Sequence, residues 1–540
     1  MRVRPAGGIT FPHPVAFWAG FVACVAGVAL HLPMYFNAAD MHYHMAGMPM
    51  DTPMQIGMAL IVAGLVATAY GLIPRGLKAA GRTKDAKVRA ADDGRLRPAH
   101  IGLIVVLAVA VTIDAMKPIT LSFVAPGMGQ EYGLKSVLNP HGHYPVALLP
   151  FSGLTGTVLG SFLWGWLGDR IGRRSSILFA GVLFMTTAIC GAMPSFWWNL
   201  AMCLMMGLAA GGMLPITFSL LAETIPGRHR GWLMVLIGGN LALAYAITSQ
   251  LSASLVPHYS WRILWLTGMP TGVLLILLNR WIPESPRFLL AHGRDEEARQ
   301  IMAKYGTVET GQAQVEVAEP DTDHGSYLTL FRKPHARVSL AVVVLGLGIG
   351  LVTYGFQLWI PSNLQKLGLS QSTASRALGD SALLGLPLVF IAAAMYGLWS
   401  AKKTIVVLTT LVSVTLLVFS VEGQSLARNH NWLFLVLTGP IVGTATIAAV
   451  LAAYSSEIYP TRIRSRGSGL SAGVGKLGGV IVTTVLVAGA TIPSIGTTAL
   501  LGAIPLLLAI ATFAFFGVEP QAQTAGESTE PTRDLKPAEV

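Results

Sequence analysis

Two charged side chains are predicted to lie inside the lipid bilayer. Asp114 and Lys117 fall in the long apolar run near residues 100–124, next to Pro118. An ionised side chain at the centre of a membrane helix costs about 2.5–3.5 kcal/mol on insertion scales, so it usually serves a partner or a pathway. Their spacing of three places both on one helical face. We expect a self-neutralising couple in which proton uptake by Asp114 frees Lys117 to meet an anion. The alternatives are a permanent structural pair, or a lysine that extends to the membrane surface.

Other polar and aromatic side chains interrupt the apolar runs and are candidates to line a pore. Helix–helix hydrogen bonding explains any single one of them at least as well. The candidates are Asn240, Tyr245, Gln250, Tyr354, Gln357, Trp359, Asp380 at the predicted start of a helix, Tyr454 and Ser455.

A stretch rich in methionine and histidine joins the first two apolar runs. It contains Met41, His42, His44 and Met45 close together. Thioether and imidazole groups suit copper, especially the cuprous ion. These four residues could capture copper outside the membrane. We prefer the alternative that the loop packs without metal, because the sequence gives no evident Cys or Met pathway onward.

The elements that position these residues are predicted to be membrane-spanning helices. The chain has 540 residues, of which 53% are hydrophobic and 12% charged, and its mean hydropathy is +0.59. Soluble proteins carry roughly twice that charged fraction. Repeated apolar runs of about twenty residues predict a polytopic α-helical membrane protein. The predicted spans are 14–36, 55–73, 100–124, 147–166, 176–193, 198–221, 232–255, 262–281, 338–360, 381–399, 404–421, 432–453, 468–490 and 498–516.

The net charge of +11 is explained by membrane orientation rather than by nucleic-acid binding. With fourteen spans, every basic loop falls on one side of the membrane, which the positive-inside rule makes cytoplasmic. Both termini are then cytoplasmic, and the compact loops suggest a bacterial inner membrane. Cys24, Cys190 and Cys203 all lie in apolar runs, so neither a disulfide framework nor a Cys metal site is indicated.

Three motifs organise the spans. The turn Gly165-Trp-Leu-Gly-Asp-Arg-Ile-Gly-Arg-Arg174 fits the pattern G-x-L-x-D-R-x-G-R-R at every fixed position. Glu223-x-x-Pro226-x-x-x-Arg230 recurs as Glu457-x-x-Pro460-x-x-x-Arg464 at the same place in the second set of six spans, which indicates duplication. Pro283-Glu-Ser-Pro-Arg-Phe-Leu289 follows the first set.

These motifs resemble those of the major facilitator superfamily, in its sugar-porter and metabolite:proton symporter branch. The resemblance covers about residues 100–517 and implies two six-helix bundles, with the first two spans as an extra hairpin. We expect a hairpin with its basic linker at 1–97, bundles at 98–282 and 338–517, a cytoplasmic loop at 283–337 and a disordered tail at 518–540.

The resemblance also implies alternating access, in which the motif residues gate the passage. Asp169 would cap or pair across the interface, and the arginines would hold charge partners. The alternative is that these charges only fix orientation in the membrane. The expected gating residues are Gly165, Asp169, Arg170, Gly172, Arg173, Arg174, Glu223, Arg230, Glu457 and Arg464.

We therefore expect a monomeric secondary transporter in the bilayer that moves a small organic metabolite, such as an organic anion, with protons. It would be neither an enzyme nor dependent on a cofactor. Gly473-Val-Gly475-Lys476-Leu477 resembles only part of a phosphate loop. The alternatives are an exporter of toxic compounds and a metal-responsive receptor or assembly factor.

Overall fold

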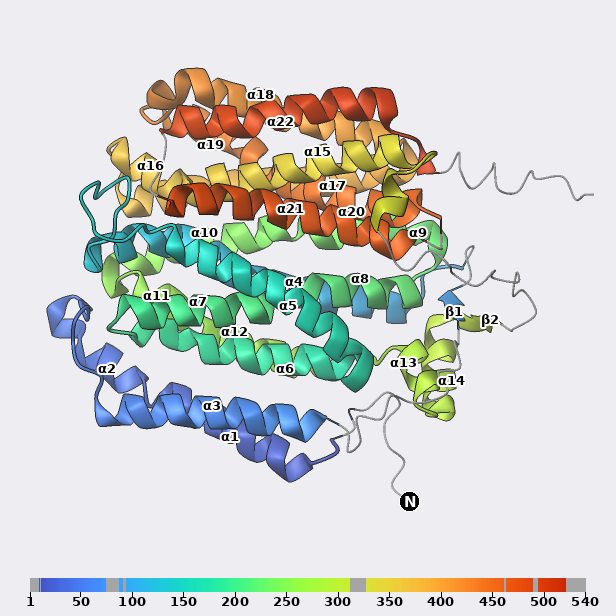
Figure 1. Cartoon of the computed structure of the whole chain (residues 1–540), viewed down its shortest axis with the longest axis horizontal. Coiled ribbons are helices and arrows are strands. Elements are labelled where there is room, and N and C mark those ends of the chain that lie inside the picture. Colours follow the sequence, from blue (N-terminus) through green and yellow to red (C-terminus); the bar gives the residue numbers. More distant parts are fainter. Residues whose placement is uncertain are drawn as a thin grey trace, which may run out of the picture.

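The computed structural model describes residues 9, 11–73, 87–90, 94–310, 327–460, 463–488 and 494–520. Within this part of the chain, fourteen helical segments are long and apolar enough to cross a membrane. Their axes run roughly parallel to one another (Figure 1). The predicted all-α membrane fold of two bundles with an extra hairpin is confirmed. The division into domains by residue number stays a prediction.

The first two spans form the N-terminal hairpin. Helix α1 (Pro14–Ala29) continues as α2 (Leu32–Asn37), a short 3₁₀ turn η1 (Ala39–Met41) follows, and α3 (Thr52–Leu72) returns. Glycines let α1 and α3 approach closely. A methyl group added at Gly64 would lie 2.7 Å from the Cys24 sulfur, and one added at Gly27 would lie 2.7 Å from the Gly57 carbonyl oxygen. Small residues at such contacts are the usual means of packing helices in lipid.

The next six spans form the N-terminal half. Several of them are interrupted by a kink or a change of helix type, and α4 contains both Pro118 and Pro126. The elements are α4 (Pro98–Glu131), α5 (Leu148–Ile171), α6 (Arg173–Thr186) with η2 (Thr187–Ala192), α7 (Phe196–Ala210) with α8 (Met213–Thr224), α9 (Gly227–Gly239) with α10 (Leu241–Tyr259), and α11 (Arg262–Leu266) with α12 (Gly268–Leu278) and η3 (Asn279–Trp281).

The last six spans form the C-terminal half, which lies on the far side of the N-terminal half from the hairpin (Figure 1). Two of its spans contain one turn of π-helix, a distortion often found at functional sites. The elements are α15 (Ala336–Leu351) with the π-turn η6 (Val352–Phe356), η7 (Gln357–Trp359) and α16 (Ile360–Lys366), α17 (Gln371–Leu398), α18 (Ala401–Leu426), α19 (His430–Thr438) with the π-turn η8 (Gly439–Gly443) and α20 (Thr444–Ile458), α21 (Arg464–Val487) and α22 (Ile495–Phe516).

One predicted helix start is wrong. Helix α17 begins at Gln371, because the Ser370 side chain accepts a hydrogen bond from the Thr373 backbone N–H and caps the helix. Asp380 is therefore the tenth residue of α17 rather than its first. The hydropathy pattern missed this start because the first turns of α17 are polar.

The connection between the halves contains short elements that the sequence did not indicate. They are α13 (Pro286–Ala291), α14 (Asp295–Tyr305), the 3₁₀ turn η5 (Tyr327–Phe331) and two strands, β1 (Lys87–Ala90) and β2 (Thr307–Thr310). The strands pair antiparallel, with Lys87 opposite Thr310. Helices α13 and α14 and the strands lie at one end of the bundle, opposite the hairpin loop (Figure 1). Most of the predicted basic linker and nearly all of the C-terminal tail lie outside the described residues.

Candidate functional site

Lys117 is buried inside the N-terminal half. Its Nζ donates hydrogen bonds to the Phe184 carbonyl oxygen, at 2.7 Å, and to Thr187 Oγ1, at 2.5 Å. It also lies 4.6 Å from the centre of the Phe184 ring. The change from α6 to the 3₁₀ segment η2 at Thr187 brings these two oxygens together. Gly268 of α12 leaves room for the amine, since a methyl group added there would lie 2.6 Å from Nζ.

Asp114 is also buried, but Lys117 is not its partner. Among the described residues, no cation lies within 4.0 Å of the Asp114 carboxylate, and no hydrogen bond reaches it. The expected Asp114–Lys117 couple is therefore not formed in this conformation. The i,i+3 spacing was correct, but the lysine turns toward the oxygens of α6 and η2, which satisfy an amine without a second charge.

The predicted pore residues of α10 lie at contacts with α4 and α17. Tyr245 packs edge-on against Phe123, with ring centres 5.5 Å apart, and its buried hydroxyl has no hydrogen-bond partner in the described chain. Gln250 Nε2 donates to Asp380 Oδ1 at 2.8 Å. This bond joins the two halves. Asn240 ends α9 and is half-buried.

The predicted pore residues of the ninth span divide between two roles. Gln357 donates to the carbonyl oxygens of Pro440 and Ile441, which lie in the π-turn η8. It therefore holds two distorted spans of the C-terminal half together. Tyr354 instead packs on Gly479 of α21, where Leu154 of the N-terminal half also comes close.

The remaining aromatic and hydroxyl candidates are buried in the C-terminal half. Trp359 Nε1 and Ser455 Oγ have no hydrogen-bond partner among the described residues. Tyr454 donates to the Val518 carbonyl oxygen, so it anchors the segment that follows α22.

The sequence reasoning missed Lys476 as a pore candidate. It lies in the middle of α21, and its Nζ donates to Ser161 Oγ of α5. This hydrogen bond crosses between the two halves. No described carboxylate lies within 4.0 Å of the amine. A lysine within a predicted membrane span could have indicated this position from the sequence. From the sequence, Lys476 was considered only as part of an incomplete phosphate loop.

The basic turn between α5 and α6 binds the Pro283–Leu289 motif. Glu284 accepts hydrogen bonds from the backbone N–H groups of Arg173, at 2.7 Å, and Arg174, at 3.3 Å. Gly172 has φ +94°, a left-handed conformation, and a methyl group there would lie 2.7 Å from the Glu284 carboxyl carbon. Burial raises the pKa of Glu284 to about 7, although these N–H groups favour its charged form.

Other residues of the predicted gate form further contacts. Glu223 accepts a hydrogen bond from the Ser285 hydroxyl, and the Arg174 Nε donates to the Asn279 carbonyl oxygen at 3.1 Å. Arg170 lies 4.0 Å above the Trp166 ring. All of these residues belong to the N-terminal half or to the segment that connects it to the C-terminal half. The sequence motifs therefore mark a structural contact within one half.

The second copy of the Glu–Pro–Arg motif contacts both halves. Glu457 accepts a hydrogen bond from the Tyr396 hydroxyl at 2.6 Å. A methyl group added at Gly231 of α9 would lie 3.2 Å from the Glu457 carboxyl carbon. In the first copy, Arg230 Nη2 donates to the Ile225 carbonyl oxygen at 3.3 Å.

Gly165 is exposed and has open space around it. The side chains of Asp169 and Arg464 lie outside the description, so the gating roles stay predictions.

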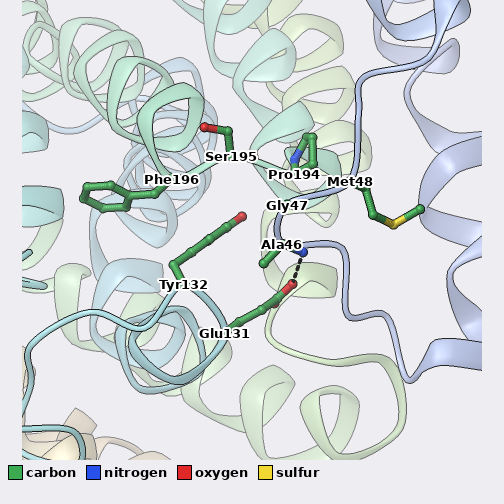
Figure 2. Close-up of a pocket in the computed structure, with 8 residues that line it drawn as sticks. All are labelled: Ala46, Gly47, Met48, Glu131, Tyr132, Pro194, Ser195 and Phe196. Carbon is green, nitrogen blue, oxygen red and sulfur yellow. Dashed lines mark hydrogen bonds between the residues drawn. The ribbon is translucent and has the colours of Figure 1, made fainter. Parts of the chain in front are cut away.

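The hairpin loop closes over the C-terminal end of α4. The Glu131 carboxylate forms an ion pair with Arg262 at 2.5 Å and accepts bonds from the backbone N–H groups of Met45, at 2.8 Å, and Ala46, at 3.1 Å. A cavity of about 560 Å³ lies beside this contact (Figure 2). It is lined by Ala46, Gly47, Met48, Glu131, Tyr132, Pro194, Ser195 and Phe196.

The four residues of the predicted copper site do not share one environment. Met45 is fully buried in an apolar cluster, whereas Met41, His42 and His44 are exposed. Copper binding by the loop stays a prediction.

The family model for "Sugar (and other) transporter" matches residues 147–530, well over half of the chain. The chain belongs to this family. It is thus a multi-pass membrane transporter of small metabolites in the major facilitator superfamily. This membership favours transport over the receptor alternative.

Several known proteins are similar to this transporter in sequence. The niacin transporter of Acinetobacter baylyi is 28% identical over 62% of this chain and 77% of its own length. The gallate transporter of Pseudomonas putida is 27% identical over 72% and 85%. The inner membrane metabolite transport protein YgcS of Escherichia coli is 30% identical over 62% and 74%.

The fold also matches solved structures. The partially occluded, inward-open xylose transporter XylE of E. coli aligns with a TM-score of 0.60 and 16% identity, over 78% of this chain and 98% of that one. The crystal structure of a D-xylose-proton symporter aligns with a TM-score of 0.58 over the same shares of both chains. At this identity the likeness concerns the fold alone.

Proposed function

We propose that this transporter moves a small organic anion through the membrane by alternating access, in symport with protons. The observation that carries the proposal is Lys476. A half-buried amine between the two halves, hydrogen-bonded across to Ser161 and without a described carboxylate partner, leaves a positive charge available for an anion. An anion bound there would contact both halves at once, which couples its binding to their relative movement.

The similar proteins support a carboxylate as the substrate class. Two of them are named for the transport of niacin and gallate, which are both aromatic carboxylic acids. Tyr245 and Phe123 lie on α10 and α4, and Tyr354 lies close to α21. These aromatic rings suit a flat ring attached to the carboxylate.

Asp114 is the candidate for proton coupling. A buried carboxylate without a described partner is costly when ionised, and protonation removes that cost. Lys117 is held by Phe184 and Thr187, so the proton would act on Asp114 itself rather than by releasing the lysine. Import and export would use the same parts, and the direction would follow the gradients.

Flux of nicotinate into proteoliposomes tests the anion proposal, with nicotinamide as the matched neutral compound. We expect an inward proton gradient to drive accumulation of nicotinate and not of nicotinamide. Gallate is the second probe. If neither acid is moved faster than nicotinamide, a carboxylate is not the recognised feature.

Asp114→Asn tests the coupling separately. The amide imitates the protonated acid, so we expect gradient-driven accumulation to be lost while exchange of nicotinate across the membrane continues. Accumulation at the wild-type level in this variant would exclude Asp114 as the coupling group. The protein's melting temperature shows that the variant is folded.

A further inference from the structure

Methionine side chains are concentrated where the N-terminal hairpin packs on the N-terminal half. Met34, Met45, Met54 and Met193 are buried in one apolar cluster there, and Met50, Met58, Met202 and Met269 pack against it. These are eight of the 20 methionines in the chain, whereas residues 338–517 contain only Met395. Methionine is flexible and fills irregular gaps between packed helices. Thioether sulfur adds the ability to bind soft metal ions.

A buried histidine lies beside this cluster. His31 is fully buried, and its Nδ1 lies 2.7 Å from the Gly27 carbonyl oxygen. A carbonyl oxygen can only accept a hydrogen bond, so Nδ1 carries the proton and Nε2 of the neutral ring presents a lone pair. Nε2 is buried and has no hydrogen-bond partner among the described residues. An unsatisfied buried acceptor is unfavourable for folding.

This arrangement is typical of a metal-binding imidazole. Histidines that bind a metal usually donate their other ring N–H to a backbone carbonyl or a carboxylate, which fixes the tautomer and the ring orientation. In His31, the bond to Gly27 fixes the ring with Nε2 available. The ring is also held against α3, since a methyl group added at Gly57 would lie 2.7 Å from its Cε1.

Two buried methionines lie one helical turn along the chain from His31 and from Gly57, the residue that contacts its ring. Met34 follows His31 by three residues, and Met54 precedes Gly57 by three on the face of α3 that packs on α1. Asp51 fixes the first turn of α3 by accepting a hydrogen bond from the Met54 backbone N–H at 2.9 Å. Among the described residues, no group of three or more His, Cys, Asp or Glu side chains could hold a metal ion. A metal bound beside His31 would therefore have to accept thioether sulfur and a single imidazole nitrogen.

We propose that His31 Nε2 and the thioethers of Met34 and Met54 form a buried binding site for cuprous copper between α1 and α3. Neutral thioether and imidazole ligands suit a soft monovalent ion, whereas zinc sites are built from Cys, His and carboxylate ligands, and calcium and magnesium prefer oxygen. The site differs from the exposed loop around His42 and His44. It is independent of the transported solute, and its metal stabilises the hairpin.

Competition for Cu(I) tests the site in the purified full-length protein in detergent. Cu(I) would be titrated without oxygen, in the presence of bicinchoninate as a coloured competitor. We expect the wild type to bind one buried Cu(I). His31→Asn combined with Met54→Leu should weaken this binding about tenfold or more, because losing even an outer partner of a metal ligand typically costs about 10–100-fold in affinity. Asparagine can still donate to Gly27, and leucine keeps the volume of methionine.

Two control variants separate this site from other soft ligands nearby. His42→Asn with His44→Asn removes the exposed imidazoles, and Cys24→Ser removes the nearby thiol. Both should bind Cu(I) as the wild type does. A protein that takes no Cu(I) from bicinchoninate overturns the proposal. So does a protein that keeps its Cu(I) without His31 and Met54 but loses it in either control.

Spectroscopy and stability give independent readouts. X-ray absorption of the copper-loaded protein should show both nitrogen and sulfur neighbours, and a spectrum with sulfur alone would exclude His31 as a ligand. Ag(I), a soft monovalent ion without redox chemistry, should raise the melting temperature of the wild type and not that of the double variant. Equal melting temperatures of the two proteins without metal would show that the double variant is folded. None of these measurements depends on transport.

Discussion

Lys117 and Lys476 are both amines inside membrane-spanning helices, but their surroundings differ. Lys117 donates to two oxygens of its own half, Phe184 O and Thr187 Oγ1. Lys476 donates across the interface to Ser161, and one hydroxyl satisfies only one of its three N–H groups. An anion can therefore approach Lys476 without breaking the packing of either half.

Replacing Lys476 should remove recognition of the anion. We expect Lys476→Gln to reduce nicotinate uptake about tenfold or more, since a hydrogen bond to a charged group contributes about 1.5–3 kcal/mol. Lys476→Arg should retain part of the uptake because it keeps the charge. Uptake into proteoliposomes is the measurement. Lys403→Gln, on the exposed first turn of α18, is the control and should behave as the wild type.

Glu284 should make the stability of the N-terminal half depend on pH. Its pKa is raised by burial to about 7 in the folded protein, from an ordinary 4.5. The folded state then binds more protons than the unfolded state between these values, so stability should fall as pH rises from about 4.5 to 7. We expect Glu284→Gln, which resembles the protonated acid, to flatten the dependence of melting temperature on pH in this range.

An exposed carboxyl serves as the comparison for Glu284. Glu296 lies on α14, where its carboxylate is 3.8 Å from Arg299 Nε and largely exposed. Glu296→Gln should leave the pH dependence of the melting temperature as it is in the wild type. If both variants keep the wild-type slope, Glu284 does not titrate in this range.

At the scale of elements, packing of the hairpin depends on glycine. A methyl group added at Gly64 would lie 2.7 Å from both the Cys24 sulfur and the Gly20 carbonyl oxygen. We expect Gly64→Ala to force α1 and α3 apart and to destabilise the protein by about 1–3 kcal/mol, as overpacking does. Thermal unfolding in detergent measures it. Gly102→Ala is the matched control, because nothing lies within 4 Å of the added methyl group there.

The spans could be predicted from the sequence because each is a local property of about twenty residues. The motif turn was also predictable, and Arg173 and Arg174 do form a defined contact. Their partner Glu284 is more than one hundred residues away in the sequence. No local sequence pattern indicates that the two segments are in contact. The same holds for Lys117 with Phe184 and for Lys476 with Ser161. Sequence spacing indicates the face of the helix on which each lysine lies. Which other helix contacts that face depends on tertiary packing.

At the scale of the whole molecule, the described contacts attach the hairpin to the N-terminal half. The Tyr35 hydroxyl donates to the Tyr259 carbonyl oxygen at 2.9 Å, and the Gly47 N–H donates to the Pro194 carbonyl oxygen at 3.1 Å. The Glu131 carboxylate accepts from the backbone of Met45 and Ala46. The C-terminal half lies on the opposite side (Figure 1). The hairpin should therefore move with the first half as one body of eight spans.

Distances between spin labels test this in the full-length protein. Labels at Val66 of α3, Phe162 of α5 and Val421 of α18 would all be at exposed positions. When nicotinate and a change of pH shift the transporter between states, we expect the distance from Val66 to Phe162 to stay constant. The distance from Val66 to Val421 should change by several ångströms, as in rigid-body closure. If the first distance changes as much as the second, the hairpin moves independently, and contacts through Glu131 do not fix it during the cycle.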